Sequence, residues 1–145
     1  MPAATTVPVS ALASDVRIAV TRLSRRLRRE RAVGTLTPSQ LSVLTTLDTH
    51  GPLTPSALAD HERVQPPSMT RILGRLEELG LVSRTADPAD KRQYIVALTA
   101  QGVATVTDER RRKDAWLAKR IADLSEEERA AIAAALPVIE RIAGG

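Results

Sequence analysis

Apolar residues near the N-terminus recur every three or four positions. They are Leu12, Val16, Val20, Leu23 and Leu27. This spacing places side chains on one face of an α-helix. With Ser10 as the N-cap and Gly34 beyond the end, it predicts a helix over residues 11–31. Residues 1–9 contain two prolines and few apolar side chains, which is typical of a flexible tail.

Two Thr-Pro dipeptides mark the starts of the next two helices. Thr37 and Thr54 can each act as an N-cap, and the proline that follows suits the first helical position. Gln40 can complete a capping box with Thr37, and Gly51 followed by Pro52 ends that helix. The second of these helices is short. The buried faces are predicted to contain Leu41, Leu44, Leu47, Leu58 and Ala59.

A further helix and a hairpin follow. After a turn through residues 62–65, the Pro-Pro-Ser of residues 66–68 opens a helix that Gly80 ends. Beyond Gly80, apolar and polar residues alternate, which predicts strands at residues 81–84 and 93–98 joined by a polar tip. The buried positions of the helix are predicted to be Met69, Ile72, Leu73, Leu76 and Leu79.

Two helices complete the chain. Thr99 caps a helix that is expected to end near Ala122, and Ser125 forms a capping box with Glu128 at the start of the last helix. Pro137 lies within the apolar stripe of that last helix and predicts a kink or a local break. The stripe itself is formed by Ile132, Leu136, Ile139 and Ile142.

This order of elements predicts a mainly α protein with a small β wing. Residues 37–98 would form a winged helix-turn-helix, and residues 10–36 and 99–145 would form flanking dimerisation helices within a single intertwined domain. The terminal helices carry apolar stripes that one winged helix cannot cover alone, which favours a homodimer. The expected interface contains Leu12, Leu136, Ile139 and Ile142, together with Val9.

Composition narrows the class of protein. Hydrophobic residues make up 43% of the 145 residues, but Phe is absent and Tyr94 and Trp116 are single, so Leu, Ile, Val and Ala must form a helical core. The net charge of +4 fits a polyanionic partner. The lack of cysteine excludes disulfides, thiolate metal sites and cysteine-based redox sensing. With no bilayer-spanning run and no signal-peptide layout, we expect a cytoplasmic protein without a membrane partner.

The residue pattern does not indicate an enzyme. There is no Ser/His/Asp arrangement, no carboxylate pair in a predicted cleft and no Gly-rich phosphate loop, so we expect no catalytic residues, cofactor or metal. His61 beside Asp60 and Glu62 resembles a metal cluster only in composition, because adjacent residues on a short helix point in different directions. His50 is explained by favourable placement at a helix C-terminus.

The second helix of the helix-turn-helix carries the side chains that DNA reading requires. A major groove admits one α-helix, and a good pairing of Gln with adenine or of Arg with guanine gives ~1–3 kcal/mol of discrimination. The expected major-groove contacts are Gln65, Ser68, Thr70, Arg71 and Arg75. Lys91 and Arg92 at the hairpin tip can enter the minor groove, and Asp90 would pair with Arg92 or with a backbone amide. DNA-backbone contacts are expected from Thr54, Ser56 and Pro67.

Several residues allow more than one interpretation. Arg75 and Arg84 are equally well explained as solvated surface charges. The arginines between residues 22 and 31 form a solvated face with internal salt bridges, line a pocket for an anionic effector, or touch flanking DNA. Trp116 packs in the core or an interface, or forms the wall of a ligand pocket. A winged helix that binds protein would lack the exposed arginines, whereas an architectural DNA binder without an effector would keep every feature above.

Two segments resemble the MarR family of bacterial regulators. Residues 87–102 contain the Asp-x-Arg of the family's wing, then an apolar strand that ends in Leu-Thr, and then Gly102. Residues 67–82, with the sequence PSMTRILGRLEELGLV, are similar to the family's recognition helix and its exit. The similarity extends over nearly the whole chain.

The resemblance implies a triangular homodimer on a pseudo-palindromic operator, usually acting as a repressor. Ser68 and Arg71 would then read the major groove and Arg92 the minor groove, with Asp90 holding Arg92. It also implies release from DNA by a small, often aromatic, acid or phenol that binds between the dimerisation and DNA-binding parts. The expected partners are therefore double-stranded DNA, a second copy of the chain and a small anionic or phenolic effector.

Overall fold

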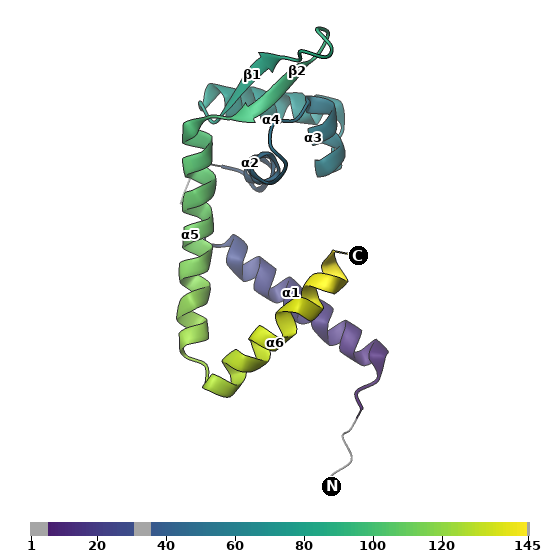
Figure 1. Cartoon of the computed structure of the whole chain (residues 1–145), viewed down its shortest axis with the longest axis vertical. Helices are drawn as coiled ribbons and strands as arrows, with labels where there is room; N and C mark the ends of the chain where they lie inside the picture. The colour runs from purple at the N-terminus through teal and green to yellow at the C-terminus, as the bar shows by residue number, and fades with distance from the viewer. Residues whose placement is uncertain (1–5, 31–35, 145) are drawn as a thin grey trace. The chain divides into compact units, whose positions relative to one another are not determined.

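The structure is a computed structural model, and it describes residues 6–30 and 36–144. The elements are α1 (Val9–Arg28), α2 (Pro38–His50), α3 (Pro55–Glu62), α4 (Pro66–Glu78), β1 (Val82–Ala86), β2 (Tyr94–Leu98), α5 (Ala100–Ala122) and α6 (Glu126–Ala143), as Figure 1 shows. The expected fold, mainly α with a small β wing, is confirmed. Most of the tail expected at residues 1–9 lies outside the described residues, as does Gly34. Helix α1 ends at Arg28 with Arg29 as its C-cap, so the expected end at residue 31 is wrong.

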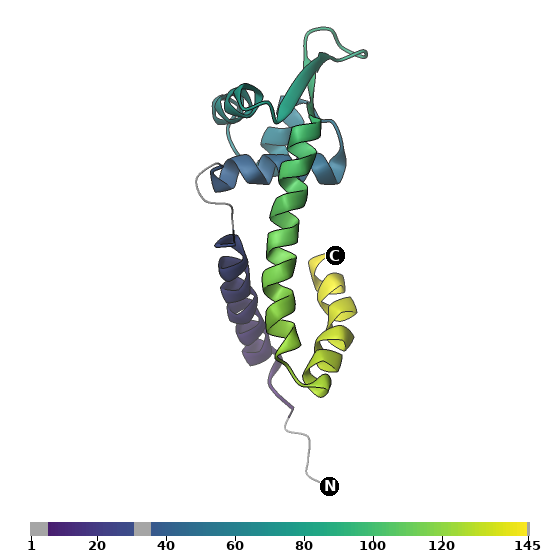
Figure 2. The same ribbon diagram turned by 90° about the vertical axis from the view of Figure 1, so that its left-hand side faces the viewer.

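The chain divides into two compact units. Residues 32–111 form one, called here the winged unit, which contains α2, α3, α4, the hairpin and the first part of α5. Residues 1–31 and 112–145 form the other, called here the helical unit, which contains α1, the rest of α5 and α6. Within the winged unit, the hairpin of β1 and β2 projects beyond the three short helices in both views (Figure 1 and Figure 2).

Local capping chemistry sets most helix starts. The hydroxyl of Thr37 accepts from the Gln40 amide at 3.2 Å and the Gln40 side chain accepts from the Thr37 amide at 3.0 Å, so the predicted capping box is confirmed. Ser125 and Glu128 form the equivalent box at α6, with distances of 3.1 and 2.9 Å. Thr54 accepts from the Ala57 amide at 3.2 Å. These contacts depend only on residues three positions apart, which is why the sequence predicts them.

The start of α1 differs from the prediction. The helix begins at Val9, and Pro8 occupies the N-cap position with φ −55° and ψ 138°. Ser10 therefore lies inside the first turn and does not cap the helix, so the predicted start at residue 11 is wrong. The physical reason is that proline already has the φ of a helix start and needs no side-chain acceptor to place the next residue in the helix.

An aliphatic core holds the winged unit together. Its fully buried side chains are Val43, Leu44, Leu58, Met69, Leu73, Leu76 and Val96. Ile72 and Leu79, which were expected inside, are half-buried because they flank the stripe of Met69, Leu73 and Leu76 on α4. Every element from α2 to β2 except β1 thus contributes a fully buried residue. Truncating one buried leucine to alanine would cost ~2–5 kcal/mol.

The hairpin and α5 meet through a short motif. Val82 pairs with Leu98 and Ala86 with Tyr94, so β1 starts and ends later than the expected strand at residues 81–84. The Thr99 hydroxyl donates to the Gly80 carbonyl at 2.6 Å and accepts from the Gly102 amide at 3.1 Å. A Cβ at Gly102 would overlap the Leu81 carbonyl oxygen. The Leu-Thr-x-x-Gly sequence thus allows the first turn of α5 to lie directly against the chain that leaves α4.

The helical unit exposes apolar side chains. Neither α1 nor α6 has a buried residue among those that the structure describes. Helix α6 continues from Glu126 to Ala143 with Pro137 inside it, so the local break allowed by the sequence is not observed. In the described parts of the chain, no helix is both long and apolar enough to cross a membrane.

Candidate nucleic-acid interface

The helix-turn-helix consists of α3, a tight turn and α4. Arg63, the C-cap of α3, has φ 54° and ψ 45°, a left-handed conformation that glycine adopts more easily. The Val64 amide donates to the Ala59 carbonyl at 3.1 Å and closes the turn. Helix α3 extends to Glu62, one residue beyond the prediction. The Glu62 carboxylate accepts from Ser42 at 2.7 Å and from Thr46 at 2.6 Å, which ties α3 to α2.

Helix α4 presents its polar face to solvent. Gln65, Pro67, Thr70, Arg71 and Arg75 are exposed and Ser68 is half-buried. The residues predicted to read the major groove therefore share one accessible side of the helix, opposite the stripe that enters the core. Among the described residues, no ion pair engages Arg71, so its guanidinium keeps all five donors for an external acceptor.

The structure restricts what some of these side chains can do. The Thr70 hydroxyl donates to the Pro66 carbonyl at 3.0 Å, so it can act toward DNA only as an acceptor. Arg75 is paired with Glu78 at 3.2 Å, which supports the alternative of a surface charge. Pro66 and Pro67 have no N–H, so the first turn of α4 offers few backbone donors to a phosphate. Thr54 is half-buried and Ser56 exposed at the start of α3.

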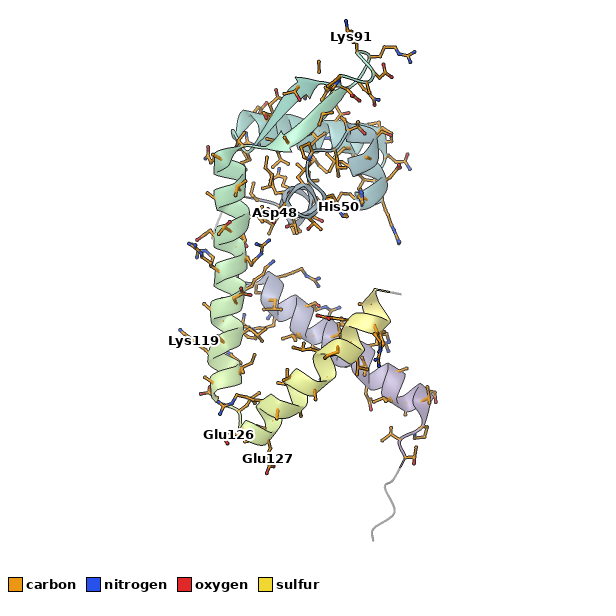
Figure 3. All side chains as sticks on the ribbon, viewed as in Figure 1. Asp48, His50, Lys91, Lys119, Glu126 and Glu127 are labelled. Carbon is orange, nitrogen blue, oxygen red and sulfur yellow. The ribbon has the colours of Figure 1, made fainter. Side chains whose placement is uncertain are left out.

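The tip of the hairpin is built from two short Asp-centred turns. Asp87 accepts from the Ala89 amide at 2.9 Å. Asp90 accepts from the Arg92 amide at 3.0 Å and from the Arg92 Nε at 3.2 Å. Both partners expected for Asp90 are therefore present at once. Lys91 extends from the tip away from the helices (Figure 3).

The two paired side chains of this tip, Arg92 and Asp90, differ in their exposure to solvent. The Arg92 side chain is 90% exposed, whereas that of Asp90 is 35% exposed. Hydrogen bonds from the backbone amide and then the side chain of Arg92 hold the pKa of Asp90 below its usual value of 3.8. Asp90 is thus ionised at neutral pH and orders the loop, while the outer edge of the Arg92 guanidinium stays open to an anion.

The winged unit is not basic as a whole. Residues 36–111 contain eight Lys or Arg against nine Asp or Glu, whereas the whole chain has a net charge of +4. The positive excess therefore lies in the helical unit. The winged unit therefore offers an anion separate cations, among them Arg71 on α4 and Lys91 and Arg92 at the tip, and no overall positive charge.

Sequence reasoning missed several residues that shape this surface. Glu77 pairs with Arg84, and Asp48 on α2 pairs with Arg110 on α5 at 2.7 Å. An acidic residue in the last turn of a helix, as Glu77 is, opposes the helix dipole, and this unfavourable position was an available signal that it has a partner. No comparable signal marks the pair of Asp48 and Arg110, which are 62 positions apart.

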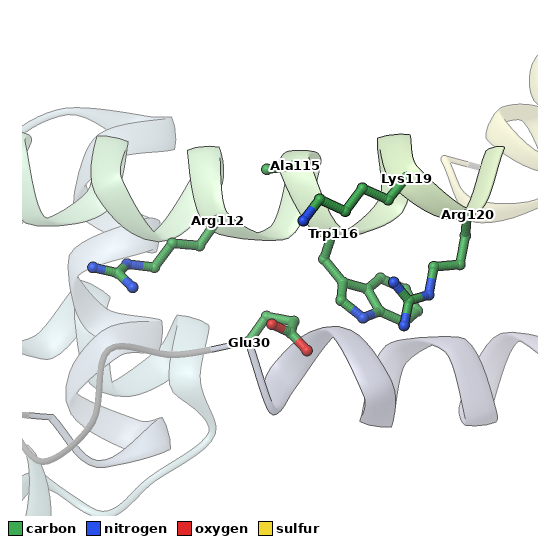
Figure 4. A pocket seen from close by; sticks show the side chains of 6 residues that line it. All are labelled: Glu30, Arg112, Ala115, Trp116, Lys119 and Arg120. Atoms are coloured by element: carbon green, nitrogen blue, oxygen red, sulfur yellow. The ribbon is translucent and has the colours of Figure 1, made fainter. Parts of the chain in front are cut away.

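A second candidate site lies in the helical unit. A pocket of about 290 Å³ is lined by Glu30, Arg112, Ala115, Trp116, Lys119 and Arg120 (Figure 4). The guanidinium groups of Arg26 and Arg120 lie over the Trp116 ring, 4.8 and 4.5 Å from its centre. The indole N–H is buried and has no hydrogen-bond partner among the described residues. Glu30, the one acidic group in the lining, pairs with Arg26 at 2.7 Å.

A helix-turn-helix with an exposed polar helix, followed by a hairpin with a cationic tip, defines a DNA-binding winged-helix protein. The profile of the MarR family matches residues 36–94. The chain is 48% identical over 118 residues to an HTH-type transcriptional regulator of Mycobacterium tuberculosis, with 81% of this chain and 82% of the relative covered. The chain therefore belongs to the MarR family and is a transcription regulator with a DNA-binding winged helix, not an enzyme.

Two further likenesses agree with this assignment. The HTH-type transcriptional repressor MdtR of Bacillus subtilis is 31% identical over 121 residues, with 81% of this chain and 78% of the repressor covered. The crystal structure of wild-type MarR from E. coli, in its apo form, matches with a TM-score of 0.74 at 25% identity, covering 92% of this chain and 96% of that one. The resemblance found in the sequence is thus confirmed at the level of the family and the fold.

Proposed function

We propose that this regulator acts in the cytoplasm as a homodimeric repressor on a pseudo-palindromic operator, and that a small anionic molecule releases it. The observation that carries the proposal is the combination of an exposed DNA-reading helix in the winged unit with uncovered apolar stripes in the helical unit. The likeness to MdtR, which is named a repressor, supports the direction of regulation.

The stripes of α1 and α6 support the homodimer. Their proposed interface residues are exposed by 52% at Leu12, 51% at Leu136, 46% at Ile139 and 74% at Ile142. Burying apolar surface contributes ~25 cal/mol per Å², so a second copy that covers these side chains lowers the free energy. A two-fold dimer places two recognition helices for half-sites that are ~34–36 Å apart along one face of the duplex.

On DNA, the unpaired Arg71 is the principal reader of the major groove. Gln65 and Ser68 lie near it at the start of α4 and contribute further base or phosphate contacts. Lys91 and Arg92 enter the minor groove with the wing, and Asp90 keeps Arg92 in position. Thr54, Ser56 and Pro67 contact the DNA backbone from the helix starts.

The Trp116 pocket is the proposed effector site. Arg112, Lys119 and Arg120 bring three positive charges to its lining. Because Arg26 and Arg120 already cover the Trp116 ring, the site favours the acidic group of a ligand over stacking of an aromatic ring. The pocket is therefore proposed to take a small carboxylate, sulfate or phosphate group.

The repressor proposal is tested with the full chain and DNA from upstream of its own gene. We expect a sequence-preferring complex at moderate salt in gel-shift assays, with two chains per operator by analytical ultracentrifugation. Leu136→Glu on α6 should yield monomers that bind the operator weakly, while Val103→Glu, an exposed apolar residue of α5 outside the proposed seam, serves as the matched control. A monomer that binds all DNA equally would refute the proposal.

The effector site is tested through Trp116, the one tryptophan in the sequence. Titration of the free protein with salicylate, benzoate and inorganic phosphate should change its fluorescence, and the anion that does so should release the operator. Lys119→Ala should weaken that response, whereas Lys113→Ala, on the same helix but outside the pocket lining, should not. A dimer that none of these anions perturbs or releases would favour a constitutive architectural binder.

A further inference from the structure

Arg84 lies on the face of the hairpin that covers the core. It pairs with Val96 across the sheet, and Val82, two residues earlier on the same strand, is buried. Because successive side chains of a strand point to opposite faces, Val82 and Arg84 share the inward face. Arg84 is thus placed at the outer limit of the core, where the hairpin leaves the rest of the winged unit.

Two contacts engage the Arg84 side chain at this place. Its Nε forms an ion pair with the Glu77 carboxylate near the end of α4. Its guanidinium carbon lies 4.5 Å from the centre of the Tyr94 ring on β2. Tyr94 pairs with Ala86, so it occupies the same face two positions further toward the tip. One side chain on β1 therefore contacts both β2 and the recognition helix.

The tip beyond Arg84 has little other support. The hydrogen bonds of residues 87–93 that fix the loop are made within the loop itself, by Asp87 and Asp90. The side chains of this segment are exposed or half-buried. A two-stranded hairpin is marginally stable in water without further packing. The orientation of the tip relative to α4 therefore depends on contacts at the level of Arg84 and Tyr94.

Glu77 lies where an unpaired carboxylate would be unfavourable. It lies in the last turn of α4, where the helix dipole disfavours a negative charge. It also belongs to a helix that approaches the phosphates of DNA, which repel a carboxylate. An ion pair with Arg84 offsets both effects and gives the acidic residue a function.

We propose that Arg84 is a positioning residue that clamps the wing to the recognition helix and does not itself bind DNA. Arg84 ties β1 to Glu77 of α4 and packs on Tyr94 of β2. The wing is then held at one orientation to α4, so that Arg71 can reach the major groove while the cations of the wing reach the minor groove. The inference rests on the proposed function of the wing as a DNA contact. It replaces the interpretation of Arg84 as a solvated surface charge.

The test measures operator affinity of the full-length protein by fluorescence anisotropy at several salt concentrations. The variants are Lys91→Ala, Arg84→Ala and the double variant, with Thr85→Ala on the outward face of β1 as the matched control. Circular dichroism melts confirm that each variant is folded. Arg84→Ala should weaken binding about fivefold, which equals ~1 kcal/mol. In that background Lys91→Ala should have almost no further effect, because an unclamped wing no longer makes the contact.

A second variant separates positioning from charge without disturbing the hairpin. Glu77→Gln removes a negative charge near the DNA, so simple electrostatics predicts tighter binding. The clamp predicts weaker binding, because Arg84 loses its ionic partner. Tighter binding by Glu77→Gln would overturn the proposal.

The double variant provides the other decisive outcome. Additive effects of Arg84→Ala and Lys91→Ala, each lowering the salt slope by ~0.9, would show that Arg84 contacts a phosphate directly and would overturn the clamp alone. If Lys91→Ala and Arg92→Ala left the affinity of the otherwise unchanged protein unaltered, the wing itself would not contact DNA. That result would overturn the proposed role of the wing together with its positioning by Arg84.

Discussion

Replacing Gly102 with alanine is expected to destabilise the winged unit, although alanine normally stabilises a helix. In a helix interior, alanine is favoured over glycine by ~0.8–1 kcal/mol. At Gly102, however, the new Cβ would overlap the carbonyl oxygen of Leu81 and would lie 3.2 Å from a methyl group of Leu98. Gly102 lies in the first turn of α5, so any relief requires that the helix move away from Leu81.

The obstructing oxygen cannot easily move. It accepts a hydrogen bond from the Thr99 amide at 3.1 Å, and Thr99 in turn holds the Gly80 carbonyl and the Gly102 amide. Forcing an extra carbon into a packed site costs ~1–3 kcal/mol. Because the overlap at Gly102 is with a backbone oxygen, the cost lies in the upper part of this range, ~2–3 kcal/mol. Subtracting the helix-propensity gain of ~1 kcal/mol leaves an expected net loss of ~1–2 kcal/mol in the free energy of unfolding.

Gly74 supplies the matched control, because it lies within α4 of the same unit and a Cβ there would meet nothing within 4 Å. Gly74→Ala should stabilise the protein by ~0.5–1 kcal/mol. Urea denaturation followed by circular dichroism, at one fixed protein concentration, measures both changes. If Gly102→Ala stabilised the protein as much as Gly74→Ala does, the close approach of α5 to Leu81 would be refuted.

Three further predictions concern the DNA-binding surface. Arg71→Ala should reduce the preference for operator over unrelated DNA by ~1–3 kcal/mol in competition gel shifts. Lys91→Ala should weaken binding to operator and to unrelated DNA about equally. The same pattern for both variants would contradict the assignment of Arg71 to base reading and of Lys91 to non-specific attraction. Asp90→Asn should destabilise the wing at neutral pH. The pKa of Asp90 is lowered, so its stabilisation is fully present above the unfolded value of 3.8 and is lost as the pH falls through the lower folded value. A difference between Asp90→Asn and the unchanged protein, measured by acid titration of stability, that grew on acidification would be inconsistent with this reasoning. Arg63→Gly should stabilise the helix-turn-helix by ~1 kcal/mol in urea denaturation, because it relieves a left-handed residue; no gain would argue against that conformation.

Much of the local structure at the candidate DNA-binding surface was predictable because it depends on neighbours in the chain. The pairing of Asp90 with Arg92 involves residues two positions apart, and the exposure of Arg71 follows from helical periodicity once Met69 and Leu73 are placed inside. The state of Arg75 was less predictable. Glu78 lies three positions further along the helix and forms an ion pair with Arg75. This local contact competes with any contact of Arg75 with DNA.

The distribution of charge was not predictable from the total. A net charge of +4 fits a polyanionic partner, but the winged unit that binds DNA carries slightly more acidic than basic residues. The excess of arginine lies in the helical unit, where Arg26, Arg112 and Arg120 lie around Trp116. The total charge therefore did not show where the basic residues lie, because that distribution depends on which segments fold into each unit.

The sequence alone determined the elements whose signals are local. N-caps, prolines and apolar repeats specified the helices of the winged unit to within a residue or so, because each start or stop depends on atoms three or four residues apart. The error at α1 was also local, since Pro8 and not Ser10 defines its start.

Only the tertiary structure decided which distant side chains meet. The contacts of Glu77 with Arg84, and of Glu62 with Ser42 and Thr46, depend on how α4 docks against the hairpin and α3 against α2. Likewise, nothing in the helical pattern shows that Gly102 lies against Leu81. Such contacts follow from the packing of a whole aliphatic core, in which strand register and helix rotation are set by many side chains at once.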